Sequence, residues 1–172
     1  GVVLVSSDPE ACKLARTYNA RIVAEGEEPG LNPAVSRAAN ILAGEGIERV
    51  MILHGDAPLS TSNEIEQLIS ALDSGPAMTI APDRVRRGSN AIAISSPNAI
   101  AFCYGPDSFA AHLHQAQLAG ITPRVLSLPG IAFDIDAPED LFALAEAEGG
   151  TSSQKFLRDL NLRGRTRIAS AR

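Results

Sequence analysis

The chain has 172 residues and a formal net charge of −5. This length suits one domain with a substantial core, and no Pro/Gly/Ser-rich stretch divides it. The negative charge argues against a general nucleic-acid surface, because non-specific binding to nucleic acid comes mainly from Lys and Arg. Hydrophobic residues make up 45% of the chain and aromatic residues only 4%, so the core must be largely aliphatic, which suits α/β packing.

No apolar run approaches the roughly 20 residues that a membrane span requires, and the N-terminus has no basic segment leading into a signal-like apolar run. We therefore expect a cytoplasmic protein that acts on small molecules and binds neither membrane nor nucleic acid. Cys12 and Cys103 lack the CxxC spacing of a redox or zinc site. Both are expected to be ordinary half-buried thiols.

The predicted elements begin with an apolar strand at residues 2–5, and Asp8 is placed to cap the helix that follows. A second strand spans residues 21–24. After a Gly-containing loop, Asn32 is expected to cap a helix that ends near Gly44.

In the middle of the chain, a strand at residues 49–54 leads to Asp56, and a helix follows. The apolar face of that helix consists of Ile65, Leu68, Ile69 and Leu72. Strands at residues 78–81 and 91–94 are joined by a loop at residues 82–90. This loop contains three arginines and a glycine, a composition that favours an anion site.

Towards the C-terminus, residues 106–118 have a helical pattern and residues 124–128 read as a strand. A short strand end at residues 133–136 precedes a helix at residues 138–148. The alternation of strands and helices predicts a three-layer αβα sandwich with a mostly parallel, Rossmann-like sheet and helices on both faces.

The composition turns basic near the C-terminus, so we assign residues 1–149 to the domain and residues 150–172 to a basic tail. Ser152 or Ser153 is placed to cap a short helix that runs through Leu160. The rest of the tail is expected to be solvated, and the alternative is a tail that closes over an anionic ligand or an acidic partner subunit.

Two acidic turns carry the strongest chemical signal. Asp56 follows one apolar strand, and Asp134 and Asp136 lie at the end of another. Ligands of open α/β sheets bind at the carboxyl ends of strands. Two carboxylates about 4 Å apart repel by roughly 4 kcal/mol at an effective dielectric of about 20, so three of them together would require a hard divalent cation such as Mg²⁺. This pattern indicates phosphoryl or nucleotidyl transfer.

Each aspartate also has a structural alternative. Asp136 is placed to cap the following helix, with Glu139 three residues later completing a capping box. Asp56 has the alternative of a turn residue ahead of Pro58. Asp134 has no such explanation, because it lies two residues before Asp136 on the same side of an extended segment.

A second cluster follows the arginine loop. Ser89 and Asn90 come directly after a glycine, where a plain hairpin turn is the alternative. Ser108 begins a helix whose N–H groups favour a phosphate, and His112 lies one turn later on the same face. Surface solvation is the alternative for His112, and it is the expected state of His54 and His114.

Together these segments resemble a known family. They are Gly30-Leu31-Asn32, Gly55-Asp56-Ala57-Pro58-Leu59, Gly88-Ser89-Asn90-Ala91, Tyr104-Gly105-Pro106-Asp107-Ser108-Phe109 with His112, and Asp134-Ile135-Asp136-Ala137-Pro138-Glu139-Asp140-Leu141. The chain resembles the 2-phospho-L-lactate or phosphoenolpyruvate guanylyltransferases of deazaflavin coenzyme F-420 biosynthesis. The resemblance covers about residues 2–144 and leaves out the tail.

The resemblance implies a nucleotidyltransferase fold of the molybdopterin-guanylyltransferase type, GTP as co-substrate and pyrophosphate as leaving group. It implies that Asp56, Asp134 and Asp136 hold two Mg²⁺ ions. The residues implied to surround the acceptor are Ser89, Asn90, Gly105, Ser108 and His112. Those implied to lie near the guanine are Glu25, Gly30, Leu31 and Asn32.

The chain departs from the family pattern at its beginning. Members of the family start with a further β-α unit, whose strand is central in the sheet and whose loop supplies Lys and Arg to the triphosphate. Without that strand, two neighbours would carry unpaired backbone edges. We expect either an N-terminal segment outside this numbering or a truncated relative with impaired GTP binding. Ser89 also stands where the family pattern has Thr.

Several alternatives remain open from the sequence. The acceptor is 2-phospholactate, phosphoenolpyruvate or 3-phosphoglycerate, since each presents a phosphate and a carboxylate on three carbons. A nucleotidyltransferase with a molybdopterin or sugar-phosphate acceptor is a second hypothesis. A nucleotide-binding module that has lost catalysis is a third. The oligomeric state, with a homodimer as one option, is also open.

Overall fold

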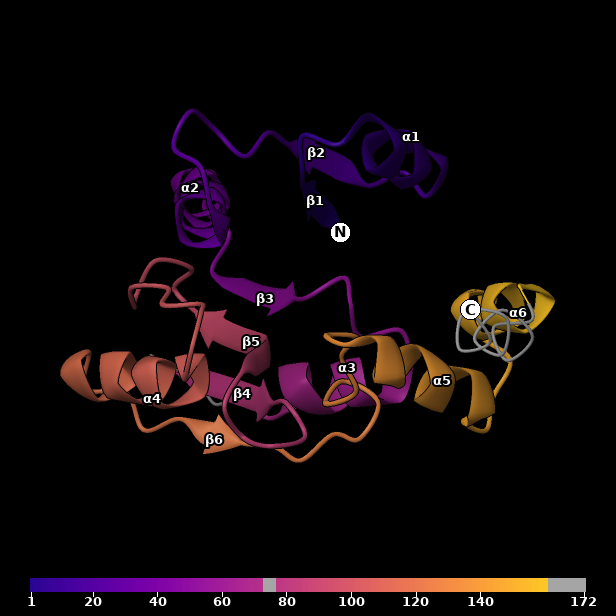
Figure 1. Cartoon of the computed structure of the whole chain (residues 1–172). Coiled ribbons are helices and arrows are strands. Elements are labelled where there is room, and N and C mark those ends of the chain that lie inside the picture. The colour runs from indigo at the N-terminus through magenta and orange to yellow at the C-terminus, as the bar shows by residue number, and fades with distance from the viewer. Residues whose placement is uncertain (73–76, 161–172) are drawn as a thin grey trace.

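The computed structural model describes residues 1–72 and 77–160. Its strands are β1 (Val3–Val5), β2 (Arg21–Val23), β3 (Arg49–Leu53), β4 (Met78–Pro82), β5 (Ser89–Ser95) and β6 (Arg124–Val125). Its helices are α1 (Pro9–Thr17), α2 (Leu31–Gly44), α3 (Ser62–Ser70), α4 (Ser108–Leu118), α5 (Pro138–Glu146) and α6 (Ser152–Asp159) (Figure 1). The expected α/β class is confirmed.

The larger sheet has the strand order β3-β5-β4-β6. Strand β5 runs antiparallel to both β3 and β4, whereas β4 and β6 are parallel. The expectation of a mostly parallel sheet therefore does not hold for this sheet. The physical reason is the short loop between β4 and β5, because parallel neighbours need a crossover of about a dozen residues or more.

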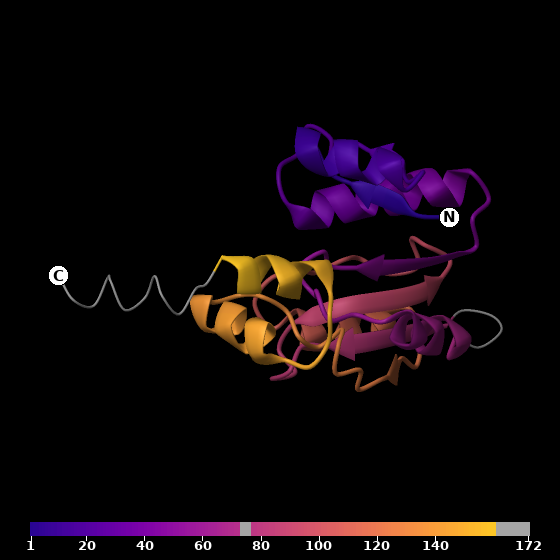
Figure 2. The same cartoon turned by 90° about the vertical axis from the view of Figure 1, so that its right-hand side faces the viewer.

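Strands β1 and β2 form a separate, parallel pair. Figures 1 and 2 both place this pair on the β3 side of the larger sheet, with α1 and α2 beside it. Within residues 1–72 and 77–160, β1 pairs only with β2, and β3 pairs only with β5. Strands β2 and β6 likewise have one partner each in this part of the chain, so β1, β2, β3 and β6 are all edge strands.

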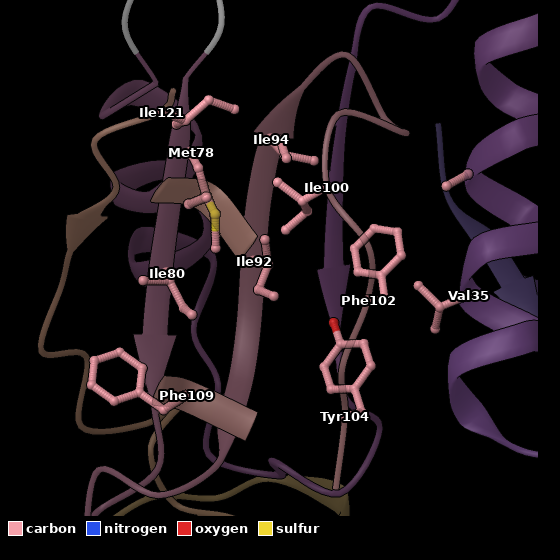
Figure 3. Packing of buried hydrophobic residues seen from close by; sticks show 12 residues of the cluster. Val35, Met78, Ile80, Ile92, Ile94, Ile100, Phe102, Tyr104, Phe109 and Ile121 are labelled. Atoms are coloured by element: carbon pink, nitrogen blue, oxygen red, sulfur yellow. The ribbon is translucent and has the colours of Figure 1, made fainter. Parts of the chain in front are cut away.

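The main core lies between the larger sheet, α2 and α4. Ile80, Ile92 and Ile94 of the sheet are completely buried. Figure 3 shows Phe102 and Tyr104 beside these strands, with Val35 of α2 directed towards Phe102. Helix α2 is also in contact with β1. It therefore connects the small sheet to the main core.

The ends of the first helices differ in how well the sequence predicted them. Asp8 caps α1, and its Oδ1 accepts from the Ala11 N–H at 2.7 Å, as expected. The assignment of Asn32 as a cap is wrong, since α2 begins one residue earlier behind Gly30. Asn32 instead binds the backbone of another loop, and this tertiary contact outweighs local capping.

The segment before α5 also differs from expectation. Residues 133–136 form no strand, because their backbone has a single hydrogen bond to a neighbouring segment rather than a ladder. The N-cap of α5 is Ala137, not Asp136, and Asp140 rather than Glu139 turns back to the start of the helix. The predicted Asp136–Glu139 capping box is therefore wrong.

Helix α6 is capped by Thr151, one residue before the predicted serines. It packs on α5 through the fully buried Gln154, whose Nε2 donates to the Ala147 carbonyl at 2.9 Å. The predicted basic tail beyond Leu160 lies outside the described residues. No helix in the described ranges is both long and apolar enough to span a bilayer.

Candidate functional site

The two acidic turns lie side by side at the carboxyl end of β3. The Ile135 N–H donates to the Asp56 carbonyl at 3.0 Å. Since Asp134 and Asp136 flank Ile135, one hydrogen bond brings all three aspartates into one small region. The sequence alone does not show this contact, because the two turns lie far apart in the chain. The structure therefore brings together the residues that the sequence singled out.

Asp134 is the most enclosed of the three aspartates, with a side chain 13% exposed. Burial raises its pKa, and the negative charges of Asp136 and Asp83 act in the same direction. Arg84 opposes the shift, because its guanidinium lies 3.9 Å from Asp134 Oδ1. A carboxylate that is disfavoured in its charged form gains from a nearby cation.

Arg84 connects this turn to α5. Its Nη2 donates to Asp140 Oδ1 at 2.6 Å and to the Asp134 carbonyl at 3.3 Å. Its guanidinium also lies 4.5 Å from the centroid of the Phe133 ring, within the range of a cation–π interaction. Arg84 thereby holds the Asp134 turn against the first turn of the helix.

Asp136 does not cap α5, because Asp140 accepts from the backbone at the start of this helix instead. The Oδ2 atom of Asp140 accepts from the backbone N–H groups of Asp136 and Ala137 at 3.1 and 2.9 Å. The side chains of Asp136 and Asp56 are exposed, and neither makes a hydrogen bond or ion pair with any residue of the described ranges. Both carboxylates are free to take a ligand.

The aspartates do not form a ready-made metal cage. Among the described residues, no group of three His, Cys, Asp or Glu side chains converges closely enough to hold a metal ion. Mg²⁺ commonly keeps several waters and binds through one or two carboxylates together with substrate phosphates. The arrangement therefore fits an ion that arrives with a phosphate ligand.

The arginine loop is more neutral than its composition suggests. Arg84 is paired as described, and Arg87 donates to Asp107 at 2.9 Å. Arg86 lies over the Phe109 ring at 5.0 Å. Asp83 closes the loop by accepting from the backbone N–H groups of residues 87 and 88. Two of the three arginines thus have carboxylate partners, which weakens the prediction of an anion site there.

The serines and histidine of the second cluster form one buried network. Ser89 Oγ lies 3.0 Å from His112 Nδ1, and the Ser89 N–H donates to Ser108 Oγ at 3.0 Å. The Cys103 N–H donates to His112 Nε2 at 2.9 Å. Three segments of the chain therefore meet at His112.

The histidines differ sharply in exposure. Surface solvation is wrong for His112, which is 0% exposed, whereas His114 is exposed as expected. His54 is half-buried, its Nε2 has no hydrogen-bond partner in the described ranges, and its ring contacts Tyr104. Burial lowers the pKa of His112 to about 4, the Ser108 backbone opposes the shift, and His54 adds to it. His112 is therefore neutral at pH 7.

The start of α4 offers fewer free amides than expected. The Ser108 N–H donates to the Gly105 carbonyl at 3.1 Å, and the Phe109 N–H donates to the Arg87 carbonyl at 2.9 Å. Gly105 itself is exposed and has φ of +133°, a conformation that favours glycine. The hydroxyls of the network, rather than the helix amides, remain for a ligand.

Asn90 and Asn32 fix the loops around the two clusters. Asn90 Nδ2 donates to the Ile131 carbonyl at 3.0 Å, which ties β5 to the segment leading to Asp134. Asn32 exchanges two hydrogen bonds with the Tyr104 backbone, at 2.9 and 2.6 Å. The start of α2 is thus joined to the loop before α4.

The other residues predicted near the nucleotide are exposed. Glu25 accepts from the Ser7 N–H at 3.0 Å. Gly30 has φ of +113° and leaves α2 without a side-chain cap, and Leu31 is 48% exposed. Glu25, Gly30 and Leu31 therefore all lie at the surface.

A groove of about 630 Å³ lies elsewhere, at the amino end of β3. It is formed by the C-terminal part of α2, Glu48 and residues 96–98. None of the candidate residues lines it.

Sequence reasoning missed three acidic residues that organise the site, Asp83, Asp140 and Glu64. The 7% exposed Glu64 accepts from the Gly130 N–H at 2.7 Å and so holds the loop ahead of Asp134. The only sequence signal for it was the Thr61-x-x-Glu64 capping box. Asp140 had a similar signal, because it lies three residues after Ala137, the N-cap of α5.

The fold resembles those of two solved structures. A crystal structure assigned as a nucleotide-diphospho-sugar transferase from Desulfovibrio desulfuricans G20 matches with a TM-score of 0.68 at 16% identity, over 91% of this chain and 71% of that one. CMP:2-keto-3-deoxy-manno-octonic acid synthetase complexed with CTP matches with a TM-score of 0.56 at 11% identity, over 83% of this chain and 78% of that one. The fold is thus of the nucleotide-diphospho-sugar transferase type.

Sequence comparison defines the family. The family model described as "Guanylyl transferase CofC like" matches residues 1–172. Phosphoenolpyruvate guanylyltransferase of Rubrobacter xylanophilus is 38% identical over 149 residues, 87% of this chain and 72% of that protein. The 3-phospho-D-glycerate guanylyltransferase of Colwellia psychrerythraea is 33% identical over 144 residues, which are 84% of this chain and 68% of that protein. The chain belongs to the CofC-like guanylyl transferase family and is a nucleotidyltransferase.

Proposed function

We propose that the protein transfers GMP from GTP to a three-carbon phosphorylated acid and releases pyrophosphate. Family membership supports guanylyl transfer. The relatives named for phosphoenolpyruvate and for 3-phospho-D-glycerate support the acceptor class, since both compounds carry a phosphate and a carboxylate on three carbons. A step in deazaflavin coenzyme F-420 biosynthesis, with 2-phospholactate or phosphoenolpyruvate as acceptor, is the biological role we propose.

The observation that carries the proposal is the Ile135–Asp56 hydrogen bond, which joins the two acidic turns. We assign Asp56, Asp134 and Asp136 to Mg²⁺ ions that arrive with the nucleotide. Bound there, Mg²⁺ would neutralise charge on the phosphates and orient them. The chain's own contribution is to hold the three carboxylates in place through Ile135, Asp140 and Arg84.

The acceptor phosphate needs no general base, because it is already ionised at neutral pH and can attack the α-phosphorus directly. Catalysis then depends on positioning and on charge neutralisation. The Ser89–Ser108–His112 network would hold the acceptor, and the start of α2 would lie near the base. The two are joined by the Asn32–Tyr104 contacts, so donor and acceptor would meet between them.

The experiment is an acceptor panel. The protein is incubated with GTP, Mg²⁺ and phosphoenolpyruvate, 2-phospholactate or 3-phosphoglycerate, and guanylylated product and pyrophosphate are both measured. Formation of both with at least one acceptor is the expected result. GTP binding by calorimetry without any product would instead indicate a nucleotide-binding module that has lost catalysis.

The site is tested in the same assay with Asp56→Asn, which keeps the shape of the side chain and removes its charge. Loss of an electrostatic contribution to the transition state typically costs about 100-fold or more in kcat, and we expect that size of loss. Asp159→Asn is the matched control, because Asp159 is exposed at the end of α6. Full Mg²⁺-dependent activity in Asp56→Asn would refute the site.

A further inference from the structure

Hydrogen-bond directions around His112 can be followed from one atom to the next. The Cys103 backbone N–H can only donate, so His112 Nε2 must accept and carries no proton. With the neutral ring expected at pH 7, the single ring proton lies on Nδ1. Nδ1–H faces Ser89 Oγ at 3.0 Å, so Ser89 cannot donate to the ring and is placed to accept from it.

This sequence of bonds leaves specific donors unused. Ser89 accepts from His112, and Ser108 Oγ accepts from the Ser89 N–H. Neither hydroxyl has an acceptor for its own proton within residues 1–72 and 77–160. Ser89 is 2% exposed and Ser108 is 3% exposed. Buried hydroxyl donors are usually satisfied, and these two adjacent donors are available to a ligand oxygen.

The ring of His112 is also held against rotation. It packs edge-on to Tyr104, with 4.7 Å between centroids, and contacts Phe102 at 6.4 Å. A rotated or flipped ring would lose the Cys103 bond or the Ser89 bond. The packing therefore fixes the tautomer as well as the position.

We propose that His112 is a positioning residue that orients the Ser89 hydroxyl as a hydrogen-bond donor to the anionic acceptor. The order of donation is Cys103 N–H to Nε2, then Nδ1–H to Ser89 Oγ, then Ser89 O–H to a carboxylate or phosphate oxygen. This inference rests on the proposed function. It assigns His112 no contact with substrate, in contrast to the sequence-based expectation that His112 lines the acceptor site.

Two substitutions of His112 distinguish the hydrogen bond of Nδ1 from that of Nε2. An asparagine amide reaches about the place of Nδ1 and can still donate to Ser89. A glutamine amide reaches about the place of Nε2 and can still accept from Cys103. We expect His112→Gln to raise the acceptor KM about 3- to 10-fold, the size of one net hydrogen bond. His112→Asn should raise it less, and kcat and the GTP KM should change little in either.

A double-mutant cycle adds a readout that a purely structural role would not produce. Ser89→Ala should raise the acceptor KM like His112→Gln, and the double variant should be no worse than Ser89→Ala alone, because the two residues act in series. His114→Gln, on the exposed side of α4, is the matched control. Equal KM values in the Asn and Gln variants, or additive effects in the cycle, would overturn the proposal.

The wild-type protein provides a test that does not depend on folding of the variants. Histidine ring ¹⁵N NMR should show His112 neutral and protonated on Nδ1, and the Nδ1 signal should shift when acceptor is added. Protonation on Nε2 would refute the inference even if guanylyl transfer is intact. Absence of any transfer by the wild type would instead refute the proposed function.

Discussion

At the level of single residues, exposure decides which ion pairs stabilise the molecule. Arg84 pairs with Asp140 at 2.6 Å, and the Asp140 side chain is only 15% exposed. Arg87 pairs with Asp107 at 2.9 Å, but both side chains are about two-thirds exposed, at 66% and 65%. Exposed pairs contribute little because water screens them and their side chains lose entropy.

We therefore predict different costs for two matched substitutions. Arg84→Gln should lower the free energy of unfolding by about 1 kcal/mol, since it also removes the stacking on Phe133. Arg87→Gln should leave it nearly unchanged, because water screens this exposed pair. Urea denaturation of both variants measures this. Equal losses would show that the Arg84 contacts do not stabilise the Asp134 turn.

The burial of His112 should make the free energy of unfolding fall in acid. Burial lowers its pKa to about 4 in the folded state, against about 6.5 in an unfolded chain. The folded state prefers the neutral ring, so the contribution is complete above pH 6.5 and is lost as the pH falls towards 4. The loss should reach about 3 kcal/mol.

The measurement is urea denaturation between pH 7 and pH 4, with an NMR titration of the His112 ring. His112→Gln should show a shallower fall over this range, because glutamine does not titrate. A His112 pKa near 6.5 in the folded protein would contradict the prediction.

Among the residues, the acidic turns could be predicted from the sequence because each follows an apolar segment, although only the segment before Asp56 forms a strand. The roles of Arg84 and Asp140 could not, since their partners lie far away in the chain. The burial of His112 was missed because its pattern on α4 fits a surface position as well as a buried one. Only its spacing of four residues from Ser108 correctly predicted that both side chains share one face of α4.

At the level of elements, the predicted cap of α1 is confirmed, because Asp8 accepts from the nearby Ala11 N–H. The Thr61–Glu64 capping box of α3, which was not predicted from the sequence, forms although Glu64 also binds the distant Gly130 N–H. Asn32 failed as a cap because the Tyr104 backbone offers its amide two hydrogen bonds at once. Sequence spacing alone does not reveal such a competitor.

Glu64 also shows why the loop before the acidic turn needs a glycine. A Cβ on Gly130 would clash with the Leu59 carbonyl oxygen and with Glu64 Oε2. Gly130→Ala should therefore lower the free energy of unfolding by about 2–4 kcal/mol through overpacking and a strained buried hydrogen bond.

Gly44→Ala is the control for this substitution, because Gly44 lies in α2 with nothing within 4 Å of an added Cβ. Alanine in a helix should leave stability unchanged or raise it by up to about 1 kcal/mol. Thermal and urea unfolding of both variants measure the difference. A harmless Gly130→Ala would show that the loop relaxes freely.

At the level of the whole molecule, the sequence predicted the α/β class but not the arrangement of the strands. The hairpin between β4 and β5 could have been recognised, since the loop at residues 83–88 is too short for a crossover. The order β3-β5-β4-β6 and the separation of the β1–β2 pair could not, because strand neighbours depend on long-range packing.

Ligand binding should stabilise the whole molecule if GTP and Mg²⁺ bind together at the acidic turns. At a ligand concentration of about 100 times Kd, linkage predicts about 2.7 kcal/mol, which corresponds to a rise in Tm of roughly 5–10 °C for a chain of this size. Differential scanning fluorimetry should show this rise with both ligands present. Mg²⁺ without GTP should produce much less, since the carboxylates form no ready-made cage.

Binding of Mn²⁺ in place of Mg²⁺, followed by electron paramagnetic resonance with a non-hydrolysable GTP analogue present, tests the metal site most directly. We predict tight Mn²⁺ binding in the wild type and affinities at least about 10-fold weaker in Asp56→Asn and Asp134→Asn, with Asp159→Asn unchanged. Wild-type Mn²⁺ affinity in both site variants would mean that the acidic turns do not hold the metal.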